Sequence, residues 1–161
     1  MARFVAANVS MQKSQKRLGE ILVAKGIINE GQLKAALEEQ KKSKKLLGDV
    51  LLEKHYIKEP DLLATLSEQF NIPVARLKDK YIDWNFVRGF SASLILDYKC
   101  FPLKIDASSV HIAITDPLDV WAMKKCEEEV RGLKLNLVLV SKEDLSDAVA
   151  RYKQYVRGNI K

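Results

Sequence analysis

Residues that bind metals or form disulfides are scarce in this chain. Its 161 residues include only two cysteines and two histidines, and Cys100 and Cys126 form no CxxC pair. Metal sites built from such residues need closely spaced ligands, so no metal cluster can be assembled here by spacing. We predict that the chain binds no metal or other cofactor and that both thiols are reduced.

Long apolar runs are also missing. No stretch approaches the ~20 apolar residues that a membrane-spanning helix needs. The first 17 residues, MARFVAANVSMQKSQKR, hold an apolar patch too short for a secretory signal and lack a convincing cleavage site. These absences predict a cytoplasmic protein with no direct membrane insertion.

Catalytic motifs are absent as well. The sequence has no GxSxG, no HExxH and no pair of carboxylates at a persuasive spacing. Gly26 and Gly31 have the spacing of a phosphate-binding loop, but Gln32 and Leu33 follow where Lys and Ser/Thr are required. Without the lysine, such a loop cannot neutralise the β- and γ-phosphates of a nucleotide. We predict that the chain is not an enzyme and has no catalytic residues.

The charge balance favours anionic partners without choosing among them. The formal net charge is +6, and apolar residues make up 47% of the chain, enough for an ordinary soluble core. Nucleotides, nucleic acid and acidic lipid headgroups would all be attracted. Part of the excess lies in the run KKSKK (residues 41–45), which is more typical of a solvated linker than of a binding site.

The chain contains an internal repeat of 24 residues. RLGEILVAKGIINEGQLKAALEEQ (17–40) is followed, after KKSKK, by LLGDVLLEKHYIKEPDLLATLSEQ (46–69), and eleven aligned positions are identical without a gap. Identity at this level over a fixed offset indicates a true duplication. In the first copy the identical residues are Leu18, Gly19, Leu22, Lys25, Ile28, Glu30, Leu33, Ala35, Leu37, Glu39 and Gln40.

Each copy reads as two helices, which predicts four short helices over residues 14–70. Apolar residues at helical spacing form the first helix, and Gly26 is suited to the left-handed residue that ends it. Asn29 and Gln32 then have the spacing of a capping box at the start of the next helix. His55 replaces this glycine in the second copy, so we expect that turn to close differently.

On the second helix of each copy, an apolar stripe ends in a glutamine. These stripes are Leu33, Leu37 and Gln40 in the first copy and Leu62, Leu66 and Gln69 in the second. A glutamine at a helix end often reaches only solvent. Alternatively, its amide binds a flat ligand with a polar edge, such as a purine, because an amide both donates and accepts hydrogen bonds.

Gly19 and Gly48 are expected in the first turn of their helices, where glycine costs about 1 kcal/mol relative to alanine. Such a glycine either lets an anion approach free backbone N–H groups or lets two helices pack closely. Arg17 lies at the positive end of the same helix, an unfavourable place for a cation. A bound anion or a guanine would resolve that conflict, and a duplicated unit suits a ligand with two purines and two phosphates.

The remainder of the chain predicts a small α/β subdomain. Strands are expected at CFPLKI (100–105), VHIAIT (110–115) and LNLVLV (135–140). A helix is expected from Asp116-Pro117 to Gly132, a short helix near 91–98, and a final helix that opens with Ser141 and Glu143 as its cap. We expect Trp84 and Trp121 to be buried or half-buried. The predicted class is α+β: a flexible tail over 1–13, a four-helix tandem repeat over 14–70 and a three-stranded α/β subdomain over 71–161.

The two repeated motifs, RLGxxL with LxxALxxQ and LGxxL with LxxxLxxQ, separated by five residues, are recognisable. They resemble the amino-terminal domain of type II secretion and type IV pilus assembly ATPases, and in particular its tandem-motif form, MshEN, which binds cyclic di-GMP. The second half, with FNIPVARL, FPLKID and VHIAITDPLD, resembles the α/β part of the same domain. The likeness covers residues 15–155.

By motif position, the resemblance implies a cyclic di-GMP site in which leucines of both motifs pack on the ligand and the first arginine and glutamine contact its guanines. The implied residues are Arg17, Leu18, Gly19, Leu33, Leu37, Gln40, Leu47, Gly48, Leu62 and Leu66, with Asp49 and Asp116 as further base contacts. Leu46 replaces the arginine in the second copy, so the two halves of the site are chemically unequal.

Two functions follow as hypotheses. In the first, the chain is a regulatory module whose binding of cyclic di-GMP controls a secretion or pilus ATPase, either attached or separate. In the second, it binds no ligand and only docks such an ATPase to its inner-membrane platform protein. Family members that only dock would be expected to lose the arginine and the glutamine, and both are present here, which favours the first hypothesis. Neither hypothesis involves DNA or RNA.

Overall fold

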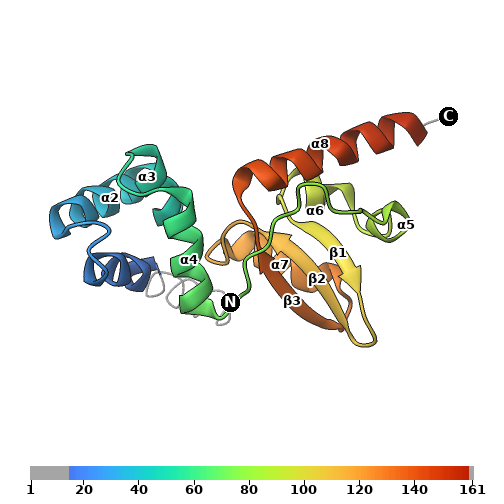
Figure 1. Cartoon of the computed structure of the whole chain (residues 1–161), viewed down its shortest axis with the longest axis horizontal. Coiled ribbons are helices and arrows are strands. Elements are labelled where there is room, and N and C mark those ends of the chain that lie inside the picture. The colour runs from blue at the N-terminus through green and yellow to red at the C-terminus, as the bar shows by residue number, and fades with distance from the viewer. Residues whose placement is uncertain (1–14, 160–161) are drawn as a thin grey trace. The chain divides into compact units, whose positions relative to one another are not determined.

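The computed structural model describes residues 15–159, and the flexible tail expected over 1–13 lies outside the described residues. The chain divides into two compact units, one running to Asn71 and including Leu118–Val120, the other made of Ile72–Pro117 and Trp121–Lys161. The first unit is helical, and the second is built on a three-stranded sheet (Figure 1). This mixture confirms the α+β class.

The helical unit contains the predicted helices. Residues 15–24 are helical and form what we call the leading helix. They are followed by α2 (Glu30–Ser43), α3 (Leu47–Glu53) and α4 (Glu59–Phe70). The capping box at Asn29 is present: its side chain accepts from the Gln32 backbone N–H at 2.8 Å, and the Gln32 side chain accepts from the Asn29 N–H at 2.9 Å.

The two copies close their turns in the same way, so the expectation that His55 closes its turn differently is wrong. Gly26 and His55 both have left-handed backbones, with φ of 71° and 57°. The Gly26 N–H donates to the carbonyl of Val23 at 2.9 Å, and the His55 N–H donates to that of Leu52 at 3.0 Å. The repeat therefore dictates the backbone, and the histidine adopts a conformation that favours glycine.

Replacing His55 by glycine is expected to stabilise the fold. A left-handed backbone costs a residue with a Cβ about 1–2 kcal/mol, while the added freedom of glycine in the unfolded chain offsets about 0.4–1 kcal/mol. We expect a net gain of about 0.5–1 kcal/mol, measured by urea unfolding. Gly26→His is the matched control and should lower stability. Equal stability of His55→Gly and the wild type would show that the turn carries no strain.

The spacer KKSKK is not simply a linker. α2 continues through Ser43, so Lys41 and Lys42 form its last turn, where cations interact favourably with the helix dipole. Lys44 ends the helix with a left-handed φ of 57°. The ammonium of Lys45 lies 2.8 Å from a carboxylate oxygen of Glu53. Lys44 thus terminates α2, and Lys45 forms an ion pair with Glu53 of α3.

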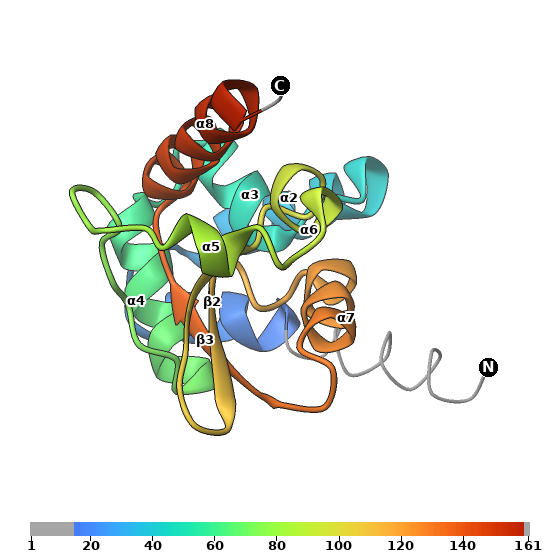
Figure 2. The same ribbon diagram turned by 90° about the vertical axis from the view of Figure 1, so that its right-hand side faces the viewer.

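The α/β unit has the sheet order β1-β2-β3. β1 (Phe101–Ile105) pairs antiparallel with β2 (Ser109–Ile114), and β2 pairs parallel with β3 (Lys134–Leu139). The parallel pair requires a crossover, which α7 (Val120–Glu129) provides. Figure 2 shows α7 to one side of β2 and β3, with α8 (Lys142–Asn159) beginning on their other side.

The outer edge of β3 is covered by a segment that the sequence did not reveal. Val74 forms a parallel bridge with Leu139. The Leu139 N–H donates to the carbonyl of Pro73 at 2.8 Å, and the Ala75 N–H donates to the carbonyl of Leu139 at 2.9 Å. A proline is tolerated here because only its carbonyl is needed, and the cover removes part of an exposed sheet edge.

The predicted cap of α8 (Lys142–Asn159) is correct at Ser141 but not at Glu143. The Ser141 hydroxyl accepts from the backbone N–H of Asp144 at 3.1 Å. The Asp144 carboxylate instead accepts from the backbone N–H of Leu77 at 2.7 Å. Asp144 therefore holds the segment around Leu77 against α8, and does not complete a capping box.

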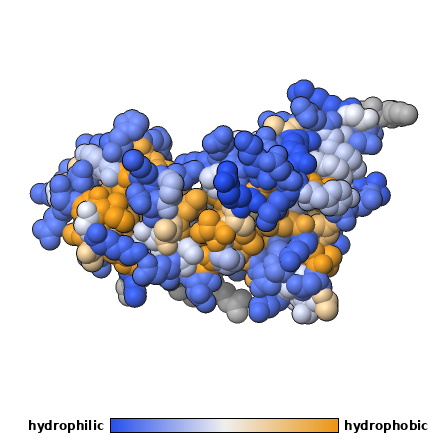
Figure 3. Space-filling model, viewed as in Figure 1, coloured by the Kyte–Doolittle hydropathy of each residue, from blue (hydrophilic) through white to orange (hydrophobic). Residues whose placement is uncertain are grey.

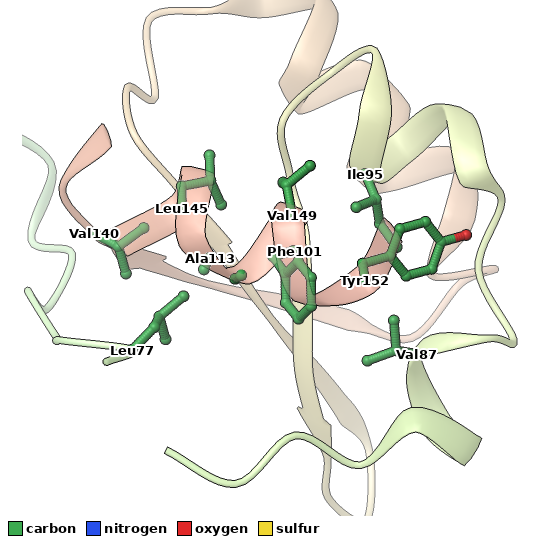
Figure 4. Packing of buried hydrophobic residues seen from close by; sticks show 10 residues of the cluster. Leu77, Val87, Ile95, Phe101, Ala113, Val140, Leu145, Val149 and Tyr152 are labelled. Atoms are coloured by element: carbon green, nitrogen blue, oxygen red, sulfur yellow. The ribbon is translucent and has the colours of Figure 1, made fainter. Parts of the chain in front are cut away.

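Side chains from α8 and from the segments before β1 form the core of this unit against one face of the sheet (Figure 4). The Phe101 side chain is 1% exposed. Its ring packs edge-on against the ring of Trp84, a residue of α5 (Trp84–Val87), with 6.4 Å between the ring centroids. The buried members are Leu77, Val87, Ile95 of α6 (Ala92–Leu96), Phe101, Ala113, Val140, Leu145, Ala148, Val149 and Tyr152.

The two tryptophans differ. Trp84 is half-buried, as predicted, and stacks on Tyr155 with ring centroids 4.8 Å apart. Trp121, however, is 56% exposed, so its expected burial is wrong. It lies in the first turn of α7, whose buried residues are Ala122 and Cys126, four apart and therefore on one helix face. Trp121 lies beside that face and projects towards solvent.

A polar cluster ends the sheet at the β1–β2 turn. The Asp106 carboxylate accepts from the Ser109 hydroxyl at 2.5 Å and lies 2.8 Å from Nε2 of His111. These partners, Ser109 first, hold the pKa of Asp106 well below its ordinary range. The Ser109 hydroxyl donates to the carboxylate and not to the imidazole, so the cluster shapes a turn and does not activate a nucleophile.

The lowered pKa of Asp106 predicts an acid-dependent loss of stability. Because the folded-state pKa lies below the unfolded value of about 3.9, the stabilisation is complete above that value and is lost as the pH falls further. We expect Asp106→Asn to flatten the fall of Tm between about pH 4 and pH 2. Thermal unfolding across this range measures it, and an unchanged slope in the variant would contradict the assignment.

Candidate functional site

Eleven of the twelve predicted site residues belong to the helical unit, and Asp116, after β2, belongs to the other unit. Their exposure divides them. Arg17 is exposed; Leu33, Leu37, Gln40 and Asp49 are half-buried; and Leu18, Gly19, Leu47, Gly48, Leu62, Leu66 and Asp116 are buried.

The two copies bury their equivalent helix faces unequally. On α4, Leu62 and Leu66 are only 4% and 0% exposed. On α2, the equivalent Leu33 and Leu37 remain half-buried. Figure 3 shows apolar side chains at the surface of the helical unit in the region of α2 and α3. The stripe of α2 therefore offers an apolar surface that the stripe of α4 does not.

Gly19 packs closely against Leu33 of α2. A Cβ on this residue would lie 2.3 Å from Cδ1 of Leu33, far inside van der Waals contact. Gly19 is also not in a first turn, because the leading helix is already helical at Gln15. Its N–H then lies within the ladder of intrahelical bonds, so the expected place of Gly19 in a first turn is wrong, and the alternative of close helix packing is favoured. Gly48, by contrast, is the second residue of α3, as predicted.

Gln40 makes a contact that the repeat did not predict. Its Nε2 donates to Oε1 of Gln15, a residue that lies before the first copy. The same oxygen accepts from the backbone N–H of Leu47, the first residue of α3, at 3.3 Å. One buried amide thus joins the end of α2 to the beginning of the second copy. Only its burial identifies Gln15, because the sequence repeat does not include it.

Arg17 does not join this group. Gln15 and Gly19 are four residues apart on the leading helix, and the contacts of both are with α2. A residue midway between them points to the opposite side of the helix. Arg17 is accordingly exposed. The structure therefore brings together Gly19, Leu33, Gln40 and Leu47, but not the arginine.

Asp49 lies in the first turn of α3 and is half-buried. An acidic side chain there interacts favourably with the helix dipole, so its position has a structural reason besides any role in base recognition. Asp116 is 8% exposed, too buried to meet a ligand from solvent without some rearrangement of its surroundings.

Other kinds of site can be assessed over residues 15–159. Within this stretch, His, Cys, Asp and Glu side chains form no group of three or more that could hold a metal ion. No helix of the described chain has the length and apolar character needed to cross a bilayer. Cys100 and Cys126 are buried, and they are not joined in a disulfide.

Comparison with known proteins agrees with this architecture. Type IV pilus assembly ATPase PilB of Myxococcus xanthus (strain DK1622) is 28% identical over 136 residues, covering 84% of this chain but 24% of that protein. The chain therefore spans about a quarter of the length of this relative.

Solved structures share the fold. A structure described as MshE with cdg superimposes with a TM-score of 0.75 at 28% identity, covering 84% of this chain and 97% of that one. The N-terminal domain of XpsE gives a TM-score of 0.67 at 18% identity, covering 84% and 93%, a likeness in fold alone. A model of the MshEN domain matches residues 70–159, just over half of the chain. The predicted family is thus confirmed by the second half of the chain, and the chain belongs to the MshEN domain family.

Proposed function

We propose that this chain is a non-catalytic regulatory domain that binds cyclic di-GMP through its two tandem motifs. The observation that carries the proposal is the half-buried stripe of α2, formed by Leu33, Leu37 and Gln40. Leucine side chains beside an amide match a purine, which has apolar faces and a polar edge. The similarity to MshE with cdg, over 97% of that chain, supports the same ligand.

Calorimetric titration of the whole chain with cyclic di-GMP tests this proposal. GTP and cyclic di-AMP serve as controls for phosphate charge and for base identity. We expect saturable one-to-one binding of cyclic di-GMP alone. Absence of heat, together with no change in Tm at saturating ligand concentrations, would overturn the proposal.

A second function has its own support. Leu18, Leu47 and Leu66 are fully buried, and Gly19 is explained by its contact with Leu33. Much of the repeat is therefore accounted for by the core of the helical unit without any ligand. In this alternative the chain is an interaction domain that docks a secretion or pilus ATPase to its inner-membrane platform protein, in the cytoplasm.

The system that the domain serves is inferred from its relatives. PilB is named as a type IV pilus assembly ATPase, and the chain matches 24% of its length. We infer that the ligand-bound domain controls an ATPase of this kind, attached or separate. Copurification of the chain with such an ATPase, with and without cyclic di-GMP, would separate the regulatory function from ligand-independent docking.

A further inference from the structure

Gln15 is a buried polar residue that forms hydrogen bonds to two other helices of the helical unit. It is 6% exposed, and a buried amide is costly unless its hydrogen bonds are satisfied. Its Oε1 accepts from Nε2 of Gln40 and from the backbone N–H of Leu47. A single oxygen therefore connects the leading helix, α2 and α3.

The contact with Leu47 completes the start of α3. Leu46 occupies the N-cap position and makes no side-chain hydrogen bond there. The first N–H groups of a helix have no intrahelical partner, and the buried Leu47 N–H finds its acceptor in Gln15 at 3.3 Å. The chain thus supplies from the leading helix the cap that the local sequence lacks.

The same contact fixes which way the Gln40 amide faces. A backbone N–H can only donate, so the Gln15 atom beside Leu47 must be its carbonyl oxygen. The Gln40 atom that meets this oxygen must then be its NH₂ group. One N–H of the Gln40 side-chain amide donates to Gln15. The positions of its other N–H and of its Oε1 are thereby fixed.

The geometry assigns to Gln15 the role of a positioning residue that sets base specificity at the α2 stripe, an inference that rests on the proposed cyclic di-GMP function. On their Watson–Crick edges, guanine presents the O6 acceptor beside the N1–H donor, whereas adenine presents the N6–H₂ donor beside the N1 acceptor, the opposite order. A Gln40 amide free to rotate by 180° would satisfy either order. Held by Gln15, it satisfies only one.

The second copy has no glutamine at the equivalent position. Lys44 stands there, is exposed, and closes α2 with a left-handed φ of 57°. The contact made by Gln15 is therefore a feature of the first copy, around Gln40.

Titration of Gln15→Leu, Gln40→Leu and the double variant with cyclic di-GMP and cyclic di-AMP tests this assignment. We expect Gln15→Leu to weaken cyclic di-GMP binding about tenfold, the value of one hydrogen bond, and to narrow its preference over cyclic di-AMP. In the Gln40→Leu background, Gln15→Leu should have no further effect. Losses that multiply in the double variant would show that Gln15 acts on the fold alone and would overturn the assignment.

Gln15→Glu is the control for a folding defect in Gln15→Leu. A carboxylate still accepts from both the Gln40 NH₂ and the Leu47 N–H. Its charge should weaken both dianionic ligands alike, so the preference for guanine is expected to be retained. A changed preference in Gln15→Glu would overturn the assignment.

The failure of the proposed function is distinguishable from the failure of the contact. If the wild-type chain binds neither nucleotide, the cyclic di-GMP function is lost, and the specificity role with it. The contact itself is read from the Gln40 side-chain NH₂ resonances in ¹⁵N NMR spectra. A shift of these resonances in Gln15→Leu supports the held amide, and unchanged resonances contradict it.

Discussion

Replacing Arg17 by alanine is expected to weaken cyclic di-GMP binding by about 10–200-fold, which corresponds to about 1.5–3 kcal/mol for one charge-assisted hydrogen bond. The resemblance assigns Arg17 to a guanine, and a guanidinium matches O6 and N7 of that base with two parallel donors. Because Arg17 is exposed, its loss should leave the fold intact. Calorimetric titration gives the affinity, and thermal unfolding verifies the fold.

Two variants serve as controls for Arg17→Ala. Lys41→Ala removes an exposed cation next to Gln40 and should change affinity little, which separates a specific contact from general attraction. Arg17→Lys keeps the charge but loses the planar fork, so it should restore only part of the affinity. Wild-type affinity in Arg17→Ala would remove Arg17 from the site and leave the α2 stripe as the remaining candidate.

Replacing Phe101 by alanine is expected to cost about 3–5 kcal/mol of unfolding free energy, as is usual for a buried phenylalanine. Its side chain is 1% exposed and lies in the core between the sheet and α8 (Figure 4). The edge-on contact with Trp84, with rings at 82°, would be lost as well. Urea unfolding followed by tryptophan fluorescence measures the loss.

Tyr81→Ala is the matched control for Phe101→Ala. Tyr81 belongs to the same unit but is 91% exposed, so its removal should change the unfolding free energy by no more than about 0.5 kcal/mol. Phe101→Leu should cost less than Phe101→Ala because it leaves a smaller cavity. Comparable losses in the Tyr81 and Phe101 variants would contradict the position of this core.

Local sequence signals were sufficient for most of the secondary structure. The asparagine and glutamine of the capping box, the glycine that ends the leading helix, and alternating apolar residues in β1 and β2 act through neighbours in the chain. Their predictions hold because the interactions involved span only a few residues. The short helix α5 has a capping aspartate, Asp83, but its four residues are too few to show a helical period. The segment that covers β3 had no local signal, since it depends on a strand more than sixty residues away.

Within the candidate site, the sequence identified positions but not their surroundings. By itself it determined the duplication, the helices that the duplication implies, and the family to which the chain belongs, because these depend on residue order and spacing. Only the tertiary structure decided that the stripe of α4 is buried while that of α2 is half-exposed, since burial depends on what packs against each face. It likewise decided that His55 adopts a left-handed turn and that Gln15 holds Gln40. The turn and the contact depend on backbone geometry and packing in the whole unit. Neither His55 nor Gln15 has a local sequence preference that predicts these features.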